Sequence, residues 1–519
     1  MSSSGGEVKI SAGTHSRRKK SGHSELHLWG SAGLVLLFAL VVRVAVFAVS
    51  SNGIDFHFNA YDHALFTWHD WMQSDRWVPL TAYGPLHFYL LRLFFVLFGF
   101  DPEWTPRLLS LVFGVASIWP LMRLTHREMG NRAAIFAGLI ASAYPLAVRL
   151  SVVSLEVTLF HFTVLMAIDA ASGSDKRRWY PVLIAAFWLT LASATRFEAW
   201  LLIPLLCLVV LIRAGWIRVI VFGALASIFP LVWMYVNWRI TGNPTEFAAI
   251  SAVVQKVHAA DTPMIQLLLG WPTILLRTST IPVVILAIAG IALAIHRRQG
   301  LTIAVTGLGL FALFVIFAAR GTMAFNETKY IAIVGLLIAP FAGLAIAQAT
   351  ENLRGLKNTV AVVLAVALVL GFSGQKILAD NRAFAAPADV SATCAYLATQ
   401  HKGTGRILLG VRFQGYFLVH GGQPYERFLL VPGDDATGKR SVRNFWDAVE
   451  KQAPCLMIHN TLPDRLDFQD LVPIDGINTT EMVLEGHRFR KVFRKGDWMV
   501  LSVTPENPPE PASPDKESP

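Results

Sequence analysis

The stretch PLHFYLLRLFFVLF, residues 85–98, decides how this chain is threaded through a membrane. It is apolar, but it is only about 14 residues long, whereas a spanning helix needs roughly 20. It also carries His87 and Arg92, which are costly to place in lipid. A segment of this size lies in the membrane interface more often than it crosses. We therefore expect residues 52–106 to form one long loop on a single side of the membrane.

Composition places the chain among polytopic membrane proteins. It has 519 residues, of which 54% are hydrophobic and 15% charged, with a mean hydropathy of +0.49. A soluble globule of this length would be less apolar. About eleven apolar stretches are predicted to cross the bilayer as helices. They cover residues 28–49, 108–124, 133–148, 155–171, 180–195, 200–212, 217–236, 281–295, 301–319, 330–349 and 360–372.

The basic residues indicate the orientation. If residues 85–98 do not span, the N-terminal basic cluster and five later basic loops all fall on one side of the membrane. These segments are residues 17–20, 123–132, 176–178, 213–218, 297–298 and 354–357. The positive-inside rule then places the N-terminus in the cytoplasm and residues 52–106 outside. The net charge of +10 is thereby explained by helix ends, not by a nucleic-acid partner. We expect a bacterial inner (plasma) membrane protein.

Four regions follow from this topology. Residues 1–26 read as a disordered basic cytoplasmic tail, and residues 27–373 as the transmembrane domain. Residues 374–503 alternate strand-like and helix-like patterns, which predicts a small α/β domain outside the cell. Within it we expect strands at 406–411, 428–431 and 455–459, a helix at 441–452, and a hairpin over 488–503. Residues 504–519 form a Pro/Glu/Ser-rich tail that is expected to be disordered.

The sequence lacks the motifs of several kinds of site. It contains no GxxxxGK[ST] or GxGxxG loop, so a nucleotide is not the expected energy source. No CxxC or His/Cys cluster predicts a zinc site, and whether a divalent metal takes part stays open. Cys394 and Cys455 both fall in the outer domain, but their spacing alone cannot show whether they pair.

The external loop carries the first candidates for chemistry. Asp55 and Asp62 lie close to the outer end of the first membrane helix, and Tyr61 and His63 flank Asp62. A carboxylate at the lipid–water boundary is partly desolvated, which raises its pKa toward values useful to a general base. Aromatic residues of the same loop fit sugar faces, although Trp and Tyr also mark any membrane interface.

Further ionisable residues converge on the same face. Arg149 and Glu156 flank the predicted turn between the third and fourth spans. Arg196 follows the fifth span, and Lys329 and Tyr330 open the tenth. Together with Arg92, these cations could hold a phosphate through charge-assisted hydrogen bonds. The acids could accept a proton from an acceptor hydroxyl or amine.

These residues lie in motifs whose order and spacing resemble a known group. The motifs are Tyr61-Asp62, Trp77-Val78-Pro79, Gly84-Pro85-Leu86-His87-Phe88-Tyr89, Arg107-Leu108-Leu109-Ser110, Thr195-Arg196-Phe197-Glu198 and Lys329-Tyr330. Over residues 28–350 the chain resembles the GT-C glycosyltransferases. It is most similar to the protein O-mannosyltransferase and aminoarabinose transferase group, which is glycosyltransferase family 39-like.

The resemblance implies an inverting glycosyltransferase that takes a sugar from a polyprenyl-phosphate carrier on the outer leaflet. By analogy, Asp62 is the base that acts on the acceptor, and Glu156 lies opposite it, near the acceptor or a metal. Arg196 and Lys329 would hold the lipid phosphate, and Arg43 and Arg92 could approach it. The acceptor, whether protein, lipid or glycan, is not indicated.

The chain departs from that group at several positions. Asp62 is followed by His63 where the group often has Glu, and Glu156 stands where Asp is common. Lys329 replaces the usual Arg, which removes bidentate phosphate geometry. The spacing around Asp62 is shifted by about one residue, so Asp55 remains an alternative base. A transporter or lipid flippase is the alternative function, although its polar residues would be expected near the bilayer midplane.

Overall fold

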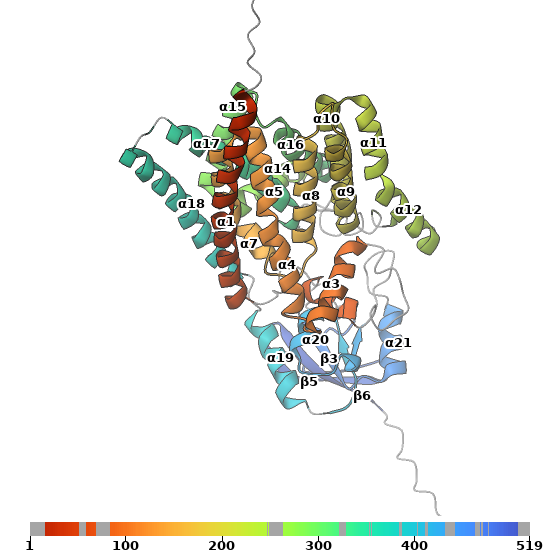
Figure 1. Cartoon of the computed structure of the whole chain (residues 1–519). Helices are drawn as coiled ribbons and strands as arrows, with labels where there is room; N and C mark the ends of the chain where they lie inside the picture. Colours follow the sequence, from red (N-terminus) through yellow and green to blue (C-terminus); the bar gives the residue numbers. More distant parts are fainter. Residues whose placement is uncertain are drawn as a thin grey trace, which may run out of the picture.

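The computed structural model is a helical bundle with a mixed α/β domain at one end (Figure 1). It describes residues 16–50, 59–68, 84–246, 248, 263–320, 328–351, 353, 355–383, 387–401, 403–410, 414–430, 442–461, 468, 471–475 and 477–506. The predicted tails fall largely outside these residues. α1 (Ser16–Val49) begins before the first predicted span and includes the basic cluster at 17–20.

The helices of the bundle follow one another through short connections. They are α2 (Asn59–Leu65), α3 (Pro85–Phe98), α4 (Thr105–Ala116), α5 (Ile118–Met129), α6 (Asn131–Ser142), α7 (Pro145–Leu150), α8 (Val157–Ser172), α9 (Tyr180–Thr195), η2 (Phe197–Leu201), α10 (Leu202–Ala214), α11 (Trp216–Ala226), α12 (Ile228–Thr241), α14 (Met264–Thr278), α15 (Ile281–Arg297), α16 (Leu301–Ala319), η3 (Thr328–Ile331), α17 (Ala332–Glu351) and α18 (Gly355–Ala383).

All of the eleven predicted stretches are helical, but not all are long enough to cross alone. Among the described residues, seven helices have the length and composition of a membrane span. An eighth candidate is the pair α14 and α15, which are bent by 113° relative to each other. α8 and α9 are shorter apolar helices, and α6 and α7 divide the predicted stretch at 133–148. α14 was not among the predicted stretches.

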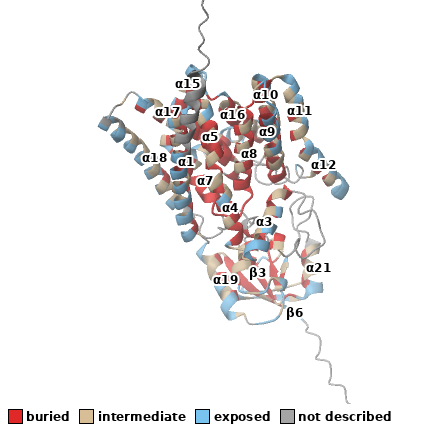
Figure 2. Cartoon of the chain, viewed as in Figure 1, coloured by how far each residue is buried: buried red, intermediate tan, exposed pale blue. Residues whose placement is uncertain are grey.

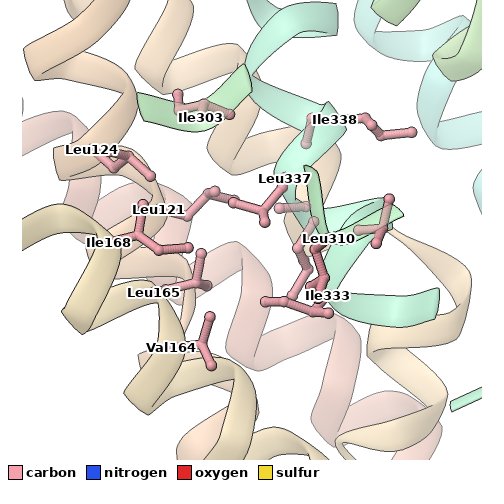
Figure 3. Close-up of a cluster of buried hydrophobic side chains, with 14 of the residues drawn as sticks. Leu121, Leu124, Val164, Leu165, Ile168, Ile303, Leu310, Ile333, Leu337 and Ile338 are labelled. Carbon is pink, nitrogen blue, oxygen red and sulfur yellow. The ribbon is translucent and has the colours of Figure 1, made fainter. Parts of the chain in front are cut away.

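The core of the bundle surrounds α17. Its side chains are almost all buried, whereas α1, α11, α12 and α18 form the outside (Figure 2). The close-up in Figure 3 shows leucine, isoleucine and valine side chains from α5, α8, α16 and α17 meeting in this core. Burial of this kind stabilises a bundle through dense packing.

Glycines allow the helices around α17 to approach closely. A Cβ at Gly290 of α15 would overlap the carbonyl of Phe341, and one at Gly343 would lie 2.6 Å from the carbonyl oxygen of Ala133 in α6. Small residues at helix interfaces are typical of membrane bundles, because van der Waals packing drives association there. Substitution at either position would force the backbones apart.

One end of the bundle holds the basic connections. Arg123 and Arg127 of α5 pair with Asp169 in the last turn of α8, and Arg213 at the end of α10 pairs with Glu128. The nearby start of α16 joins the same group, because Thr302 donates to Glu128. α1 also begins at this end, far from the α/β domain (Figure 1).

The C-terminal domain contains a six-stranded mixed sheet. Its strand order is β2-β1-β3-β6-β5-β4, with β1 parallel to both β2 and β3 and the other pairs antiparallel. Its elements are α19 (Ala388–Gln400), β1 (Ile407–Leu409), α20 (Gln414–His420), η4 (Tyr425–Arg427), β2 (Phe428–Leu430), α21 (Val442–Gln452), β3 (Leu456–Asn460), β4 (Glu481–Leu484), β5 (His487–Lys495) and β6 (Trp498–Pro505). The three predicted strands, the helix and the hairpin are confirmed. Cys394 and Cys455 are free thiols.

α3 lies at the end of the bundle that adjoins this domain (Figure 1). One face of α3, which includes Phe88, Leu91 and Phe95, is buried, while Leu93 and Val96 are exposed. An apolar exposed face fits a helix that lies along the membrane interface. Its bounds are those predicted from the sequence.

Candidate active site

A buried polar cluster lies at the end of the bundle next to the C-terminal domain. It is built from His63 of α2, His87 of α3, Glu156 at the start of α8, Arg196 at the end of α9 and Lys329 of η3. All five side chains are buried. Because α8 and α9 have their opposite ends beside the basic connections, the cluster and those connections lie at opposite ends of the bundle.

The first residues of α3 explain how His87 reaches the cluster. Gly84 packs against the carbonyl groups of Ala194 and Thr195, the last residues of α9. A Cβ at position 84 would overlap these carbonyls, so only glycine fits there. Pro85 then starts the helix, where its missing N–H costs nothing. The Gly-Pro pair thus fixes α3 directly beside Arg196.

Glu156 is held as a carboxylate. It accepts a hydrogen bond from Arg196, and its other oxygen lies 3.6 Å from Nδ1 of His63. Burial alone would raise the pKa of Glu156, but the positive charges of Arg196 and Lys329 outweigh it and hold that pKa below its usual range. A carboxylate of this kind is a poor proton acceptor and a good counter-charge.

Arg196 is shared between two acids. Its Nη2 and Nε donate to Glu198 at 2.7 and 3.1 Å, and its Nη1 donates to Glu156. Burial disfavours its charge, but Glu198 and Glu156 together raise its pKa above the usual value. The guanidinium also lies 4.8 Å from the ring centroid of Tyr330. Three of its five N–H groups are therefore committed within the protein.

Two buried histidines line the other side of Glu156. The rings of His63 and His87 lie 5.6 Å apart. Burial lowers the pKa of His63 to about 3 and that of His87 to about 4, so both are neutral at neutral pH. Within the described part of the chain, neither ring nitrogen of His87 has a hydrogen-bond partner. His87 belongs to the motif at residues 84–89 but was not chosen as a site residue. A polar residue in the first turn of an apolar interfacial helix was the signal that could have identified it.

Lys329 and Tyr330 join the cluster as predicted. Lys329 is buried, and its Nζ lies 5.7 Å from the centroid of the Tyr330 ring. The same ring lies edge-on to Trp271 of α14, with 6.2 Å between the centroids. η3 thereby brings an ammonium group and an aromatic ring beside Arg196.

The other predicted site residues have the following positions. Arg149 is buried in the last turn of α7 and flanks the turn that precedes Glu156. Arg92 is exposed, because it falls off the buried face of α3. The Tyr61 hydroxyl bonds to His420 of the C-terminal domain and to Glu103, which precedes α4. Arg43 is buried inside the bundle and donates to Ser151 and to the carbonyl of Ser142, so it is held away from the cluster.

The side chains of the two candidate bases lie outside what the structure describes. Asp55 lies outside the described residues. Asp62 lies in α2 between Tyr61 and His63, but its side chain is outside what the structure describes. Among the described residues, no group of three or more His, Cys, Asp or Glu could hold a metal ion.

Comparison with known proteins identifies the enzyme class. The profile of a family described as dolichyl-phosphate-mannose-protein mannosyltransferase matches residues 82–238. The predicted resemblance is confirmed. The matched segment contains Gly84, His87, Glu156 and Arg196, and the predicted enzyme class, a glycosyltransferase, is confirmed with it. No curated protein sequence matches the chain.

Solved structures share the fold of most of the chain. ArnT from Cupriavidus metallidurans bound to undecaprenyl phosphate is 15% identical, with a TM-score of 0.60 over 91% of this chain and 98% of that one. The Archaeoglobus fulgidus oligosaccharyltransferase in its apo form is 12% identical, with a TM-score of 0.53 over 84% of this chain and 69% of that one. The fold predicted for the transmembrane domain is thus confirmed as that of these membrane enzymes.

Proposed function

We propose that this protein is an inverting membrane glycosyltransferase that moves a sugar from a polyprenyl-phosphate carrier to an acceptor outside the cytoplasm. The observation that carries the proposal is the buried group of Glu156, Arg196 and Lys329 beside the neutral His63 and His87. Cations at one end of a membrane-spanning bundle can bind a lipid phosphate, while neutral imidazoles can bind the hydroxyl groups of a sugar.

The donor is already activated, so the reaction needs no nucleotide. The bond that breaks joins the anomeric carbon to the phosphate oxygen, and the carrier leaves as polyprenyl phosphate with the bonding electron pair. Lys329 and the uncommitted N–H groups of Arg196 would stabilise the charge that grows on this oxygen. The similar fold of ArnT bound to undecaprenyl phosphate supports this donor.

An aspartate of the external loop is the proposed base. Asp62, or Asp55 as the alternative, takes the proton of the acceptor as its oxygen or nitrogen attacks the anomeric carbon from the face opposite the phosphate. Glu156 is unsuited to this step because its carboxylate is bound by Arg196 and has a lowered pKa. Its proposed role is to hold Arg196 and to balance the charge of the site. General base help typically contributes about 10²–10⁴-fold.

The proposed orientation follows the charges. The basic residues at the helix ends pair with Asp169 and Glu128 at one end of the bundle, and the C-terminal domain adjoins the other. If all eleven stretches predicted from the sequence cross, the N-terminus would lie in the cytoplasm and the C-terminal domain outside. Among the described residues, seven helices are long enough to cross alone, or eight with α14 and α15 counted as one broken span.

The test is transfer of radiolabelled sugar by the purified full-length protein in proteoliposomes, with a panel of undecaprenyl-phosphate-linked sugars as donors. Asp62→Asn and Asp55→Asn are compared with wild type, and Arg239→Gln, which alters an exposed cation of α12, serves as the control. Transfer lost in Asp62→Asn and retained in Asp55→Asn supports Asp62 as the base; the reverse pattern assigns it to Asp55. Movement of lipid or solute without any transfer would favour the transporter instead.

A further inference from the structure

α2 lies between the bundle and the C-terminal domain. Tyr61 and Leu65 are one helical turn apart, and both belong to the apolar core of the C-terminal domain. Ala64, on another side of the helix, packs against Leu91 and Phe95 of α3. This short helix is therefore part of two cores at once, and it carries Asp62 between its contact residues.

A chain of hydrogen bonds crosses the same junction. Arg107 of α4 donates to Glu103 at 2.8 Å, and the Tyr61 hydroxyl donates to the other oxygen of Glu103. Nε2 of His420 in α20 lies 3.0 Å from the same hydroxyl. Because a tyrosine hydroxyl has a single proton, which goes to Glu103, Nε2 of His420 must be the donor in the second bond.

The end of this hydrogen-bond chain that lies in the bundle is held rigidly. Arg107 is buried and also donates from Nε to the carbonyl of Val152 at 2.7 Å and from Nη2 to that of Phe47 at 2.8 Å. Glu103 therefore accepts from a guanidinium whose position is set by the transmembrane helices. Burial, together with the charge of Glu103, raises the pKa of Tyr61, so the hydroxyl keeps its proton.

We propose that the C-terminal domain positions α2, and with it Asp62, through the bond between His420 and Tyr61. His420 and Glu103 are positioning residues of the active site, and Tyr61 is the link through which both act. The C-terminal domain is on this view a working part of the catalytic apparatus and not only a site for the acceptor. The part that concerns Asp62 rests on the proposed function; the coupling of the domain to α2 does not.

The coupling is tested first without any activity, by hydrogen exchange of residues 59–68 in the full-length protein in nanodiscs. Tyr61→Phe and His420→Leu each remove one end of the bond, and His420→Gln keeps an amide N–H that can donate. Tyr416→Phe is the matched control, because its hydroxyl lies 3.3 Å from Ser391 and its ring contacts His420 without joining the chain of bonds. Loss of a buried bond is expected to speed exchange by about tenfold.

The expected result is faster exchange in Tyr61→Phe and in His420→Leu, with the double variant no faster than Tyr61→Phe alone and with His420→Gln and Tyr416→Phe close to wild type. Unchanged exchange in Tyr61→Phe, an equal rise in Tyr416→Phe, or fully additive effects would overturn the proposal. A rise that extends to α17 would also overturn it, because it would assign Tyr61 to overall stability.

A second measurement addresses Asp62. In the transfer assay, Tyr61→Phe and His420→Leu are expected to lower kcat by about tenfold or more while KM for the donor stays within about twofold. A change in KM alone would overturn the link to Asp62. If the wild-type protein transfers no sugar, the proposed function fails, whereas the exchange experiment still decides the coupling.

Discussion

The carboxylate of Glu156 accepts a hydrogen bond from the guanidinium of Arg196, although 40 residues separate them in the chain. Both side chains are buried, so each charge has lost its hydration and depends on the other. Removing one partner of such a pair typically destabilises a protein by about 3–5 kcal/mol, because the other charge stays buried. The pair thus ties the start of α8 to the end of α9 at the centre of the candidate active site.

Glu156→Gln and Arg196→Gln are each expected to lower the free energy of unfolding by about 3 kcal/mol. The double variant should lose less than the sum, since neither charge is then left alone, with a coupling energy of about 0.5–3 kcal/mol. Chemical unfolding in detergent measures all three. Additive losses would show that the two charges do not depend on each other.

Acidification is expected to destabilise the protein between about pH 6.5 and pH 4. In the unfolded chain His63 and His87 bind protons below their ordinary pKa of 6.5, whereas in the folded protein they do so only near 3 and 4. The contribution of these two histidines to the free energy of unfolding is therefore fully present above about pH 6.5. It is lost as the pH falls, by up to about 1.4 kcal/mol per pH unit for each histidine. Because the pKa of Glu156 is lowered, its contribution is present above its ordinary value of 4.5, and it adds to the loss only near and below that pH.

The unfolding midpoint measured from pH 7.5 to 4.5 tests this assignment. His87→Gln should reduce the slope by up to about 1.4 kcal/mol per pH unit, since one of the buried imidazoles is removed. His296→Gln, which alters an exposed histidine of α15, is the control. An unchanged slope in His87→Gln would mean that other groups cause the acid sensitivity.

Gly84→Ala is expected to cost about 1–3 kcal/mol of stability and to impair transfer. The new methyl group would overlap the carbonyls that end α9 and move α3, with His87, away from Arg196. Gly33→Ala in α1 is the matched control, because nothing lies within 4 Å of a Cβ there. Full activity in Gly84→Ala would separate the position of α3 from catalysis.

Undecaprenyl phosphate is expected to stabilise the wild-type protein against thermal unfolding, because a ligand at about 100 times its Kd adds about 2.7 kcal/mol. Lys329→Met should abolish most of this effect, and Lys329→Arg should retain it. Arg320→Met is the control, since Arg320 is an exposed cation at the end of α16. Equal stabilisation of Lys329→Met and wild type would place the phosphate elsewhere.

Local signals in the sequence predicted much of this fold. The Gly-Pro start and the glycine after Phe98 mark both ends of α3, and Gly99 indeed adopts a φ of +82°. The length of the hydrophobic stretches was enough to predict the long spans. It did not find α14, which is bent against α15 and contains Pro272.

The site was predicted in part. Glu156, Arg196 and Lys329 were chosen because acids and cations at helix ends stood out in an apolar chain, and the structure brings them together. The bond between Tyr61 and His420 spans 359 residues, and no local pattern indicates such a contact. Arg43 and Arg92 show the limit of residue type alone: one is consumed by bonds inside the bundle, and the other is exposed. The roles of Asp55 and Asp62 stay predictions.

The most direct test of the account is the fate of the donor lipid. Purified protein in proteoliposomes is given undecaprenyl-phosphate-linked sugars together with cell-envelope acceptors, and the released lipid is identified by mass spectrometry. The account predicts that wild type converts one of these donors to undecaprenyl phosphate while the sugar appears on the acceptor with inverted anomeric configuration, and that Glu156→Gln does so at least about 10²-fold more slowly. A wild-type protein that leaves every donor intact, or a product with retained configuration, would contradict it.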